Sequence, residues 1–293
     1  MNWTKTWVLI LAAALLLLSA GGRTETPARL DAAAQENGVF LQEGTRYRAL
    51  LIGQTYQTSA AFPTLYGTVN DVRNMALCLS RMEGTPYETA AETDLTADGI
   101  LSAIERHFAG AEERDVSLFY FSGHGWRSSD AELCGALVGT DGLDYVTAAQ
   151  LRAALDAVPG RKIVIIDACY SGGFIAGGEF GPAPQEAEEA PENGDREYSR
   201  YFLLTGAAEN EETFEYSLDD GNMGLFTASL TAAMGWDSRG GASCALLADA
   251  DQNGAVTLQE AYAYTWEEMA AKGQHVQVYP SLCDWLVLAR RAR

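Results

Sequence analysis

The sequence predicts an α/β fold, a mainly parallel sheet with helices on both faces, and three observations support this. Two apolar runs, Val116–Phe121 and Ile163–Ile166, have the composition of strands that are buried on both faces of a parallel sheet. Segments with helical periodicity alternate with the strand candidates, as in α/β domains. Each run also ends abruptly in small and reactive residues, and open α/β sheets build their sites at that carboxyl edge.

The first half of the chain supplies four of these elements. Tyr47–Ile52 is a short apolar strand that ends at Gly53. Val69–Met82 repeats apolar residues every three or four positions, the spacing of an amphipathic helix. Thr96–Gly110 has the same spacing, and the next predicted strand is Val116–Phe121.

The second half continues the alternation. A third helix is expected at Thr147–Val158, before the strand Lys162–Asp167. The remaining predictions are a strand at Tyr201–Thr205, helices at Met223–Met234 and Leu258–Met269, and a final strand at Trp285–Leu288.

The N-terminal residues have the pattern of an export signal. Lys5 precedes an apolar run from Trp7 to Leu18, and small residues follow. Because a spanning helix needs about 20 apolar residues, we expect a signal peptide at residues 1–22, with an uncleaved anchor as the alternative. Residues 23–45 are predicted to be a linker and 46–293 the folded domain. The expected location is extracellular or in the cell envelope.

The length and net charge of the chain limit the size of its core and the kinds of molecule that it is expected to bind. The chain has 293 residues, 47% of them hydrophobic, which is enough for one large core or for one domain with an appendage. Its net charge of −20 gives no general attraction for nucleic acid but could attract basic substrates. Contact with a membrane is expected only through an uncleaved N-terminal segment. The sequence makes no prediction about the oligomeric state.

A histidine and a cysteine follow the two apolar strands. Val116–Phe121 leads into Ser-Gly-His124-Gly125, and Lys162–Asp167 leads into Ala-Cys169-Tyr-Ser-Gly-Gly. If the two strands are neighbours, the side chains of His124 and Cys169 face each other at the rim of the sheet. A thiol needs a nearby base because the thiolate is the nucleophile. The alternatives are a loop histidine and a buried structural thiol.

These motifs, together with the segments RALLIG and LYGTVNDVRNM, resemble the caspase-like cysteine peptidases, specifically the metacaspase-type bacterial branch. The resemblance runs from about Arg46 to Phe226, and the His-to-Cys separation is close to the roughly 50 residues of caspases. It implies a three-layer sandwich around a six-stranded sheet. It also implies His124 as general base, Cys169 as nucleophile, and the backbone N–H groups of Gly125 and Cys169 as the oxyanion hole. The chemistry would require no cofactor.

The resemblance also implies a specificity. In metacaspases, acids at the positions of Asp71 and Asp167 line a pocket for a basic side chain, so we expect cleavage after Arg, then Lys. The alternatives are a helix cap for Asp71 and a turn former for Asp167. Thr68 departs from the family, because some metacaspases carry a second cysteine there. Two other functions stay open, an inactive caspase-like scaffold at the cell surface and a peptidase of another preference.

Residues 177–198 form an acidic, proline-containing segment without an apolar pattern, which predicts an exposed loop. In the family that this chain resembles, the equivalent region is often where the chain is cut. We therefore expect self-processing at or near Arg196 or Arg200.

Residues 249–260 (DADQNGAVTLQE) match the EF-hand calcium loop. Glycine is at position six and an acid at position twelve, which favours calcium over a solvated turn without an ion, although no leading helix is evident. The expected ligand positions are Asp249, Asp251, Asn253, Ala255, Thr257 and Glu260.

Four further cysteines remain if Cys169 is a nucleophile. They are expected either to pair in one of three ways or to be small buried hydrophobes. The four are Cys78, Cys134, Cys244 and Cys283.

Overall fold

The structure is a computed structural model, and it describes residues 44–83, 86–128, 135–180, 200–217, 221–284 and 286–290. All of these lie in the second of two compact units, 38–293. The predicted signal peptide, most of the predicted linker, Arg196 and Cys134 lie outside the described residues. Among the described residues, no helix is both long and apolar enough to span a bilayer.

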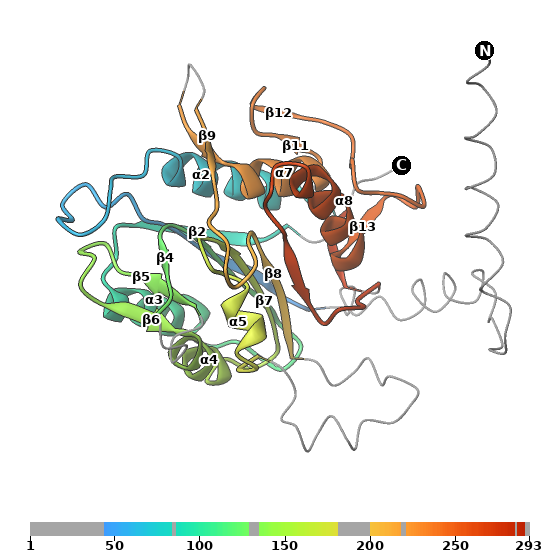
Figure 1. The fold of residues 1–293 in the computed structure, drawn as a ribbon. Helices are drawn as coiled ribbons and strands as arrows, with labels where there is room; N and C mark the ends of the chain where they lie inside the picture. Colours follow the sequence, from blue (N-terminus) through green and yellow to red (C-terminus); the bar gives the residue numbers. More distant parts are fainter. Residues whose placement is uncertain are drawn as a thin grey trace, which may run out of the picture. The chain divides into compact units, whose positions relative to one another are not determined.

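The centre of the described part is a six-stranded sheet in the order β14-β8-β7-β3-β1-β2 (Figure 1). All neighbouring pairs are parallel except β14 and β8, which are antiparallel. The predicted mainly parallel sheet is thus confirmed. The strand bounds are β1 Tyr47–Gly53, β2 Glu88–Thr93, β3 Val116–Ser122, β7 Arg161–Asp167, β8 Tyr201–Thr205 and β14 Gln277–Tyr279.

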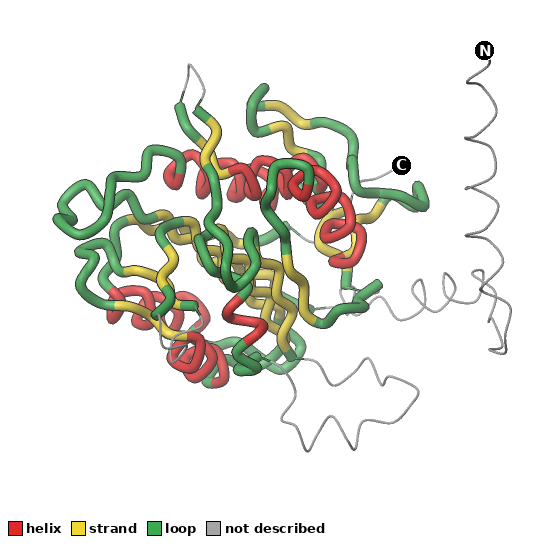
Figure 2. The backbone as a smooth tube through the Cα atoms, viewed as in Figure 1, coloured by secondary structure: helices red, strands yellow, loops and turns green. Residues whose placement is uncertain are grey.

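Helices cover both faces of the sheet and complete three layers (Figures 1 and 2). One side carries α2 (Thr68–Ser80), α7 (Leu225–Ala233) and α8 (Leu258–Ala270). The other side carries α3 (Ala97–Phe108) and α4 (Ala148–Asp156), with the short α5 (Gly173–Ala176) nearby. Successive residues of a strand enter opposite cores, as the two-residue period of a strand requires.

Short strands lie outside the main sheet. They are β4 Gly125–Trp126, β5 Ala136–Val138, β6 Tyr145–Thr147, β9 Glu215–Tyr216, β10 Met223–Gly224, β11 Trp236–Asp237, β12 Ala242–Ser243, β13 Ala255–Thr257 and β15 Val287–Arg290. The helix predicted from Met223 begins at Leu225, because Met223 and Gly224 pair with β9. This pairing places β10 beside the candidate site.

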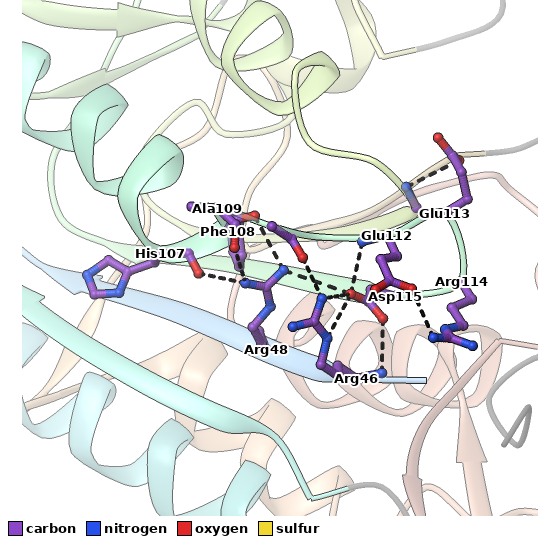
Figure 3. Close-up of polar contacts among 11 residues, drawn as sticks. Arg46, Arg48, His107, Phe108, Ala109, Glu112, Glu113, Arg114 and Asp115 are labelled. Atoms are coloured by element: carbon purple, nitrogen blue, oxygen red, sulfur yellow. Dashed lines mark hydrogen bonds and ion pairs between the residues drawn. The ribbon is translucent and has the colours of Figure 1, made fainter. Parts of the chain in front are cut away.

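The buried carboxylate of Asp115 links segments at the amino end of the sheet through hydrogen bonds (Figure 3). Asp115, which precedes β3, accepts hydrogen bonds from the Arg46 guanidinium at 2.8 and 3.1 Å and from the Glu112 N–H at 3.0 Å. Burial opposes ionisation of Asp115, but these donors outweigh it and hold the pKa of the carboxyl below its usual value. Arg48 donates to the carbonyls of His107, Phe108 and Ala109 at the end of α3.

Candidate active site

The sheet brings the two predicted loops together. β3 and β7 are adjacent and parallel, and their last residues, Ser122 and Asp167, are register partners. The Gly123 N–H donates to the Asp167 carbonyl at 3.2 Å, which continues the contact beyond the strands. A Cβ atom on Gly125 would lie 1.8 Å from the Cys169 carbonyl oxygen, so only glycine fits there. The loops of His124 and Cys169 are therefore in backbone contact.

Contacts on three sides orient the His124 ring. The backbone N–H of His124 donates to the buried Tyr56 hydroxyl at 2.9 Å, and the ring packs against both Tyr56 and Phe62, which also contact each other. His124 Nε2 lies 2.8 Å from the Pro63 carbonyl oxygen. Because a carbonyl oxygen only accepts, Nε2 carries the hydrogen and Nδ1 keeps its lone pair. Nδ1 is therefore the nitrogen that can take a proton.

The Cys169 thiol is partly buried beside Thr213. Cys169 Sγ accepts a hydrogen bond from the Thr213 N–H at 3.3 Å, and the Thr213 hydroxyl lies 3.8 Å away. Burial raises the pKa of the thiol, and the Thr213 contacts only partly offset this. Burial likewise lowers the pKa of His124, against the opposing effects of the Pro63 carbonyl and Glu215. Both shifts favour an uncharged thiol and imidazole in the resting site.

No hydrogen bond joins the Cys169 and His124 side chains among the described residues; each has the partners given above. Candidate catalytic groups are often loosely aligned without substrate. The residue after the cysteine, Tyr170, has a left-handed φ of 60°, and its N–H donates to the Glu211 carbonyl at 2.7 Å. This sharp turn sets the direction of the chain directly after the thiol.

Among the described residues, no acceptor is found for the two backbone N–H groups predicted to form an oxyanion hole. Within the described chain the Cys169 N–H donates to no group. Val138 N donates to the His124 carbonyl at 3.1 Å, so Gly125 and Leu137 face each other as a non-hydrogen-bonded pair of the β4–β5 ladder. The Gly125 N–H therefore has no partner in the described part of this ladder either.

Asp71 and Asp167 are both buried and close together. Asp71 accepts from the Ser122 hydroxyl and the Gly224 N–H, each at 2.8 Å. Asp167 accepts from the Thr227 hydroxyl at 2.6 Å and the Thr227 N–H at 3.1 Å. Burial raises the pKa of Asp71 well above its usual value, with Asp167 adding to the effect, and burial raises the pKa of Asp167 to about 6. Asp71 is not a helix cap, because Gly67 has that position in α2.

Several site residues were not expected from the sequence. Ser122 lies in the Ser-Gly-His-Gly motif and could have been suspected there. Pro63, Thr213 and Glu215 belong to no motif, and only the tertiary structure brings them to the site. Glu215 lies on β9, near both aspartates.

Other predicted sites lie elsewhere. The carboxylates of Asp249, Asp251 and Glu260 offer oxygens within 4.8 Å of one another, and Gly254 has a φ of 85° in the turn between them. Glu260 also accepts from Thr257 as the capping box of α8. Ala255 and Thr257, two of the other predicted ligand positions, lie on β13. The oxygen set suits a hard cation such as calcium.

Phe180 and Arg200 are both held in place at a distance from Cys169. Phe180 is buried against Phe174 and Tyr201. The Arg200 carbonyl accepts from the Lys162 N–H at 2.8 Å at the amino end of β7. Arg200 therefore lies at the opposite end of the strands from Cys169.

Comparison with known proteins gives the family. A family model described as the caspase domain matches residues 46–278. The chain belongs to the caspase-domain family. The caspase domain includes both loops, both buried aspartates and all six strands that the structure describes in the main sheet except for the last residue of β14. The predicted relationship to the caspase-like cysteine peptidases is thereby confirmed.

Two curated relatives of the caspase domain are plant proteins. Metacaspase-4 of Arabidopsis thaliana is 30% identical over 173 residues, which cover 53% of this chain and 41% of the relative. Metacaspase-8 of the same plant is 30% identical over 145 residues, which cover 44% of this chain and 38% of the relative. The chain thus matches about two fifths of the length of each relative.

Solved structures support the caspase-like fold. Caspase-1 from Spodoptera frugiperda superposes with a TM-score of 0.58 at 12% identity, over 86% of this chain and 92% of that one. A protein from Geobacter sulfurreducens superposes with a TM-score of 0.52 at 16% identity, over 83% of this chain and 99% of that one. At these identities the likeness concerns the fold alone.

Proposed function

We propose that this caspase-domain protein is a cysteine endopeptidase that cleaves peptide bonds after arginine, and less readily after lysine. The observation that carries the proposal is the β3–β7 pair, which brings His124 and Cys169 to one rim above two buried acids. The family assignment supports the peptidase class. The acids support a cationic substrate side chain, because a buried carboxylate pair gains most from a positive partner.

In the proposed mechanism, the Cys169 thiol gives its proton to His124 Nδ1, and the thiolate attacks the substrate carbonyl carbon. The negative charge that develops on the carbonyl oxygen is received by the N–H groups of Gly125 and Cys169. The C–N bond then breaks, and the imidazolium donates its proton to the leaving amine. Water, deprotonated by His124, hydrolyses the resulting thioester and restores the free thiol. No step needs a cofactor.

The direct test is a panel of fluorogenic peptides that differ only in Arg, Lys or Asp before the scissile bond. We expect turnover of the Arg peptide, slower turnover of the Lys peptide, and none with Cys169→Ala or His124→Ala. Turnover of only the Asp peptide would show another preference. A folded protein without turnover of any peptide, with and without calcium, would favour the scaffold alternative.

Self-processing belongs to the same proposal. Arg200 is fixed in the sheet at the far end from Cys169, so cleavage after it would disrupt the β7–β8 pairing. We therefore favour Arg196 of the two predicted positions. Intact-mass analysis of active protein should show two fragments, whereas Cys169→Ala should remain whole; a single chain in fully active enzyme would refute self-processing.

We further propose that the protein acts outside the cytoplasm, as an exported or envelope-bound enzyme, and that residues 249–260 bind calcium. The first rests on the N-terminal pattern of the sequence. The second rests on the motif and on the convergence of the three carboxylates.

A further inference from the structure

A second concave region is separate from the proposed catalytic residues. It is a cavity of about 370 Å³ lined by residues of β9, α7, the β11–β12 hairpin, α8 and the turn after α8. These elements lie on the side of the main sheet that carries α7 and α8 (Figure 1). None of the described residues that line it is a predicted catalytic, substrate-binding or metal position. Its volume is within the range of small-molecule sites, about 300–1,000 Å³.

The lining from α7 is apolar except for one hydroxyl. Ala228 and Ala232 contribute methyl groups one helical turn apart, and Leu247 adds a larger apolar side chain. Ser229 also lines the cavity, and its hydroxyl oxygen is buried without a hydrogen-bond partner in the described chain. Because a buried hydroxyl normally has a partner, Ser229 indicates a place for a polar atom of a ligand.

Arg239 supplies a positive charge to the cavity. Its Cζ atom lies over the Tyr216 ring, 4.5 Å from the ring centroid. Among the described residues, no carboxylate lies within ion-pair distance of its guanidinium. Asp237 accepts from the backbone N–H of Arg239 at 3.0 Å instead. Lys272, the other cation of the lining, already has Glu268 at 4.0 Å.

We propose that this cavity is a binding site for a small organic carboxylate, with the carboxylate on Arg239 and an apolar body against α7. A planar guanidinium can hold both oxygens of a carboxylate through parallel hydrogen bonds. One cation without a counter-ion matches a single negative charge better than the two charges of phosphate. The Ser229 hydroxyl supplies a further hydrogen bond to the ligand. The inference goes beyond the proposed peptidase activity and does not depend on it.

Cys244 gives a local measurement of binding, because its half-buried thiol lines the same cavity. In Cys169→Ala protein, peptide mass spectrometry would follow the modification of Cys244 by N-ethylmaleimide. The probes are benzoate, phenylacetate and hydrocinnamate, each compared with its amide, and inorganic phosphate. The amides keep the shape without the charge, and phosphate keeps the charge without the apolar body.

We expect at least one of the carboxylates to slow the modification of Cys244 in a saturable manner. Its amide and phosphate should bind at least about tenfold more weakly, a difference of about 1.4 kcal/mol. Titration calorimetry of the same protein gives the Kd independently of the thiol.

Four variants test the assigned groups. Arg239→Gln should raise Kd about tenfold or more, and Arg239→Lys should raise it less, because lysine keeps the charge but not the fork. Arg73→Gln removes an equal charge from an exposed position of α2 and should leave Kd within about twofold. Ser229→Ala should raise Kd without lowering the Tm of the ligand-free protein, because the hydroxyl that it removes is buried without a partner.

The inference is overturned if none of the three carboxylates protects Cys244 at about 10 mM, ten times a Kd of about 1 mM. Equal protection by the amides would also refute it, since the cavity would then be only an apolar depression. An unchanged Kd in Arg239→Gln would exclude the guanidinium as the anchor. These measurements involve no peptide cleavage, so the proposed function stands or fails separately.

Discussion

Ser122 and Asp167 are register partners at the carboxyl ends of β3 and β7, and each lies two residues before a proposed catalytic side chain. Ser122 donates to Asp71 at 2.8 Å, while Asp167 is held by Thr227. The same two strand ends therefore position both the proposed catalytic pair and the two buried aspartates. Because neighbouring strands lie about 4.8 Å apart, the sheet fixes the spacing of both.

Replacing Asp167 by asparagine should stabilise the protein while removing cleavage after arginine. The pKa of Asp167 is about 6 in the fold and near 4 when unfolded, so the folded state binds more protons between these values. Its contribution to the unfolding free energy therefore falls as pH rises from 4 to 6 and stays low above that. Asparagine avoids this loss, which is about 3 kcal/mol at most for two pKa units.

Chemical denaturation at pH 4 and pH 7 would measure this effect. The stability advantage of Asp167→Asn should grow between the two pH values. A variant less stable than the wild type at pH 7 would show that the ionised carboxylate contributes to the fold.

The KM for an arginine peptide should depend on pH through the same group. A cation binds an ionised carboxylate more tightly than a protonated one, so KM should fall as pH rises through about 6, where Asp167 loses its proton. Initial rates between pH 5 and 8 would show it. An equal pH dependence for a peptide with a neutral residue at that position would assign the change to His124 or Cys169 instead.

Gly224→Ala tests the shape of the pocket without altering the catalytic pair. Gly224 has φ −62° and ψ 136°, which alanine adopts without strain. Its Cβ, however, would lie 2.3 Å from an Asp167 oxygen, so the carboxylate must move. We expect KM for the arginine peptide to rise at least tenfold, the equivalent of about 1.4 kcal/mol. Alkylation of Cys169 by iodoacetamide should proceed at the wild-type rate; slower alkylation would mean that the substitution disturbs the thiol.

Calcium should raise the Tm of the wild type but not of Glu260→Gln. Glutamine can still form the capping box with Thr257, so the two proteins should melt at the same temperature in a chelator. At a concentration one hundred times Kd, binding stabilises by about 2.7 kcal/mol. Equal Tm values for the wild type with calcium and with chelator would leave residues 249–260 as a solvated turn.

The sequence predicts the strands that are buried on both faces, because such strands are continuous apolar runs. Val116–Ser122 and Arg161–Asp167 are buried on both faces, so their apolar runs identify them as strands. Glu88–Thr93 was missed because an edge strand exposes polar residues and lacks such a run. Met223–Gly224 was assigned to a helix because a two-residue strand has no periodicity of its own.

The residues of the candidate site also fall into two groups, those that a sequence motif indicates and those that only the fold brings to the site. His124, Cys169 and both aspartates follow or lie within motifs at the ends of elements, where a sequence pattern can indicate them. Glu215, Thr213 and Pro63 reach the site through loops whose course depends on packing between distant segments. Local patterns contain no information about such contacts.

The anchoring of Phe180 and Arg200 has a consequence for a chain opened between them. Phe180 is held by aromatic packing and Arg200 by a backbone hydrogen bond to β7, and neither depends on the peptide bonds in between. The β7–β8 pairing would continue to join the two pieces. Such a nicked molecule should therefore elute from a sizing column as one particle and separate into two bands only under denaturing conditions.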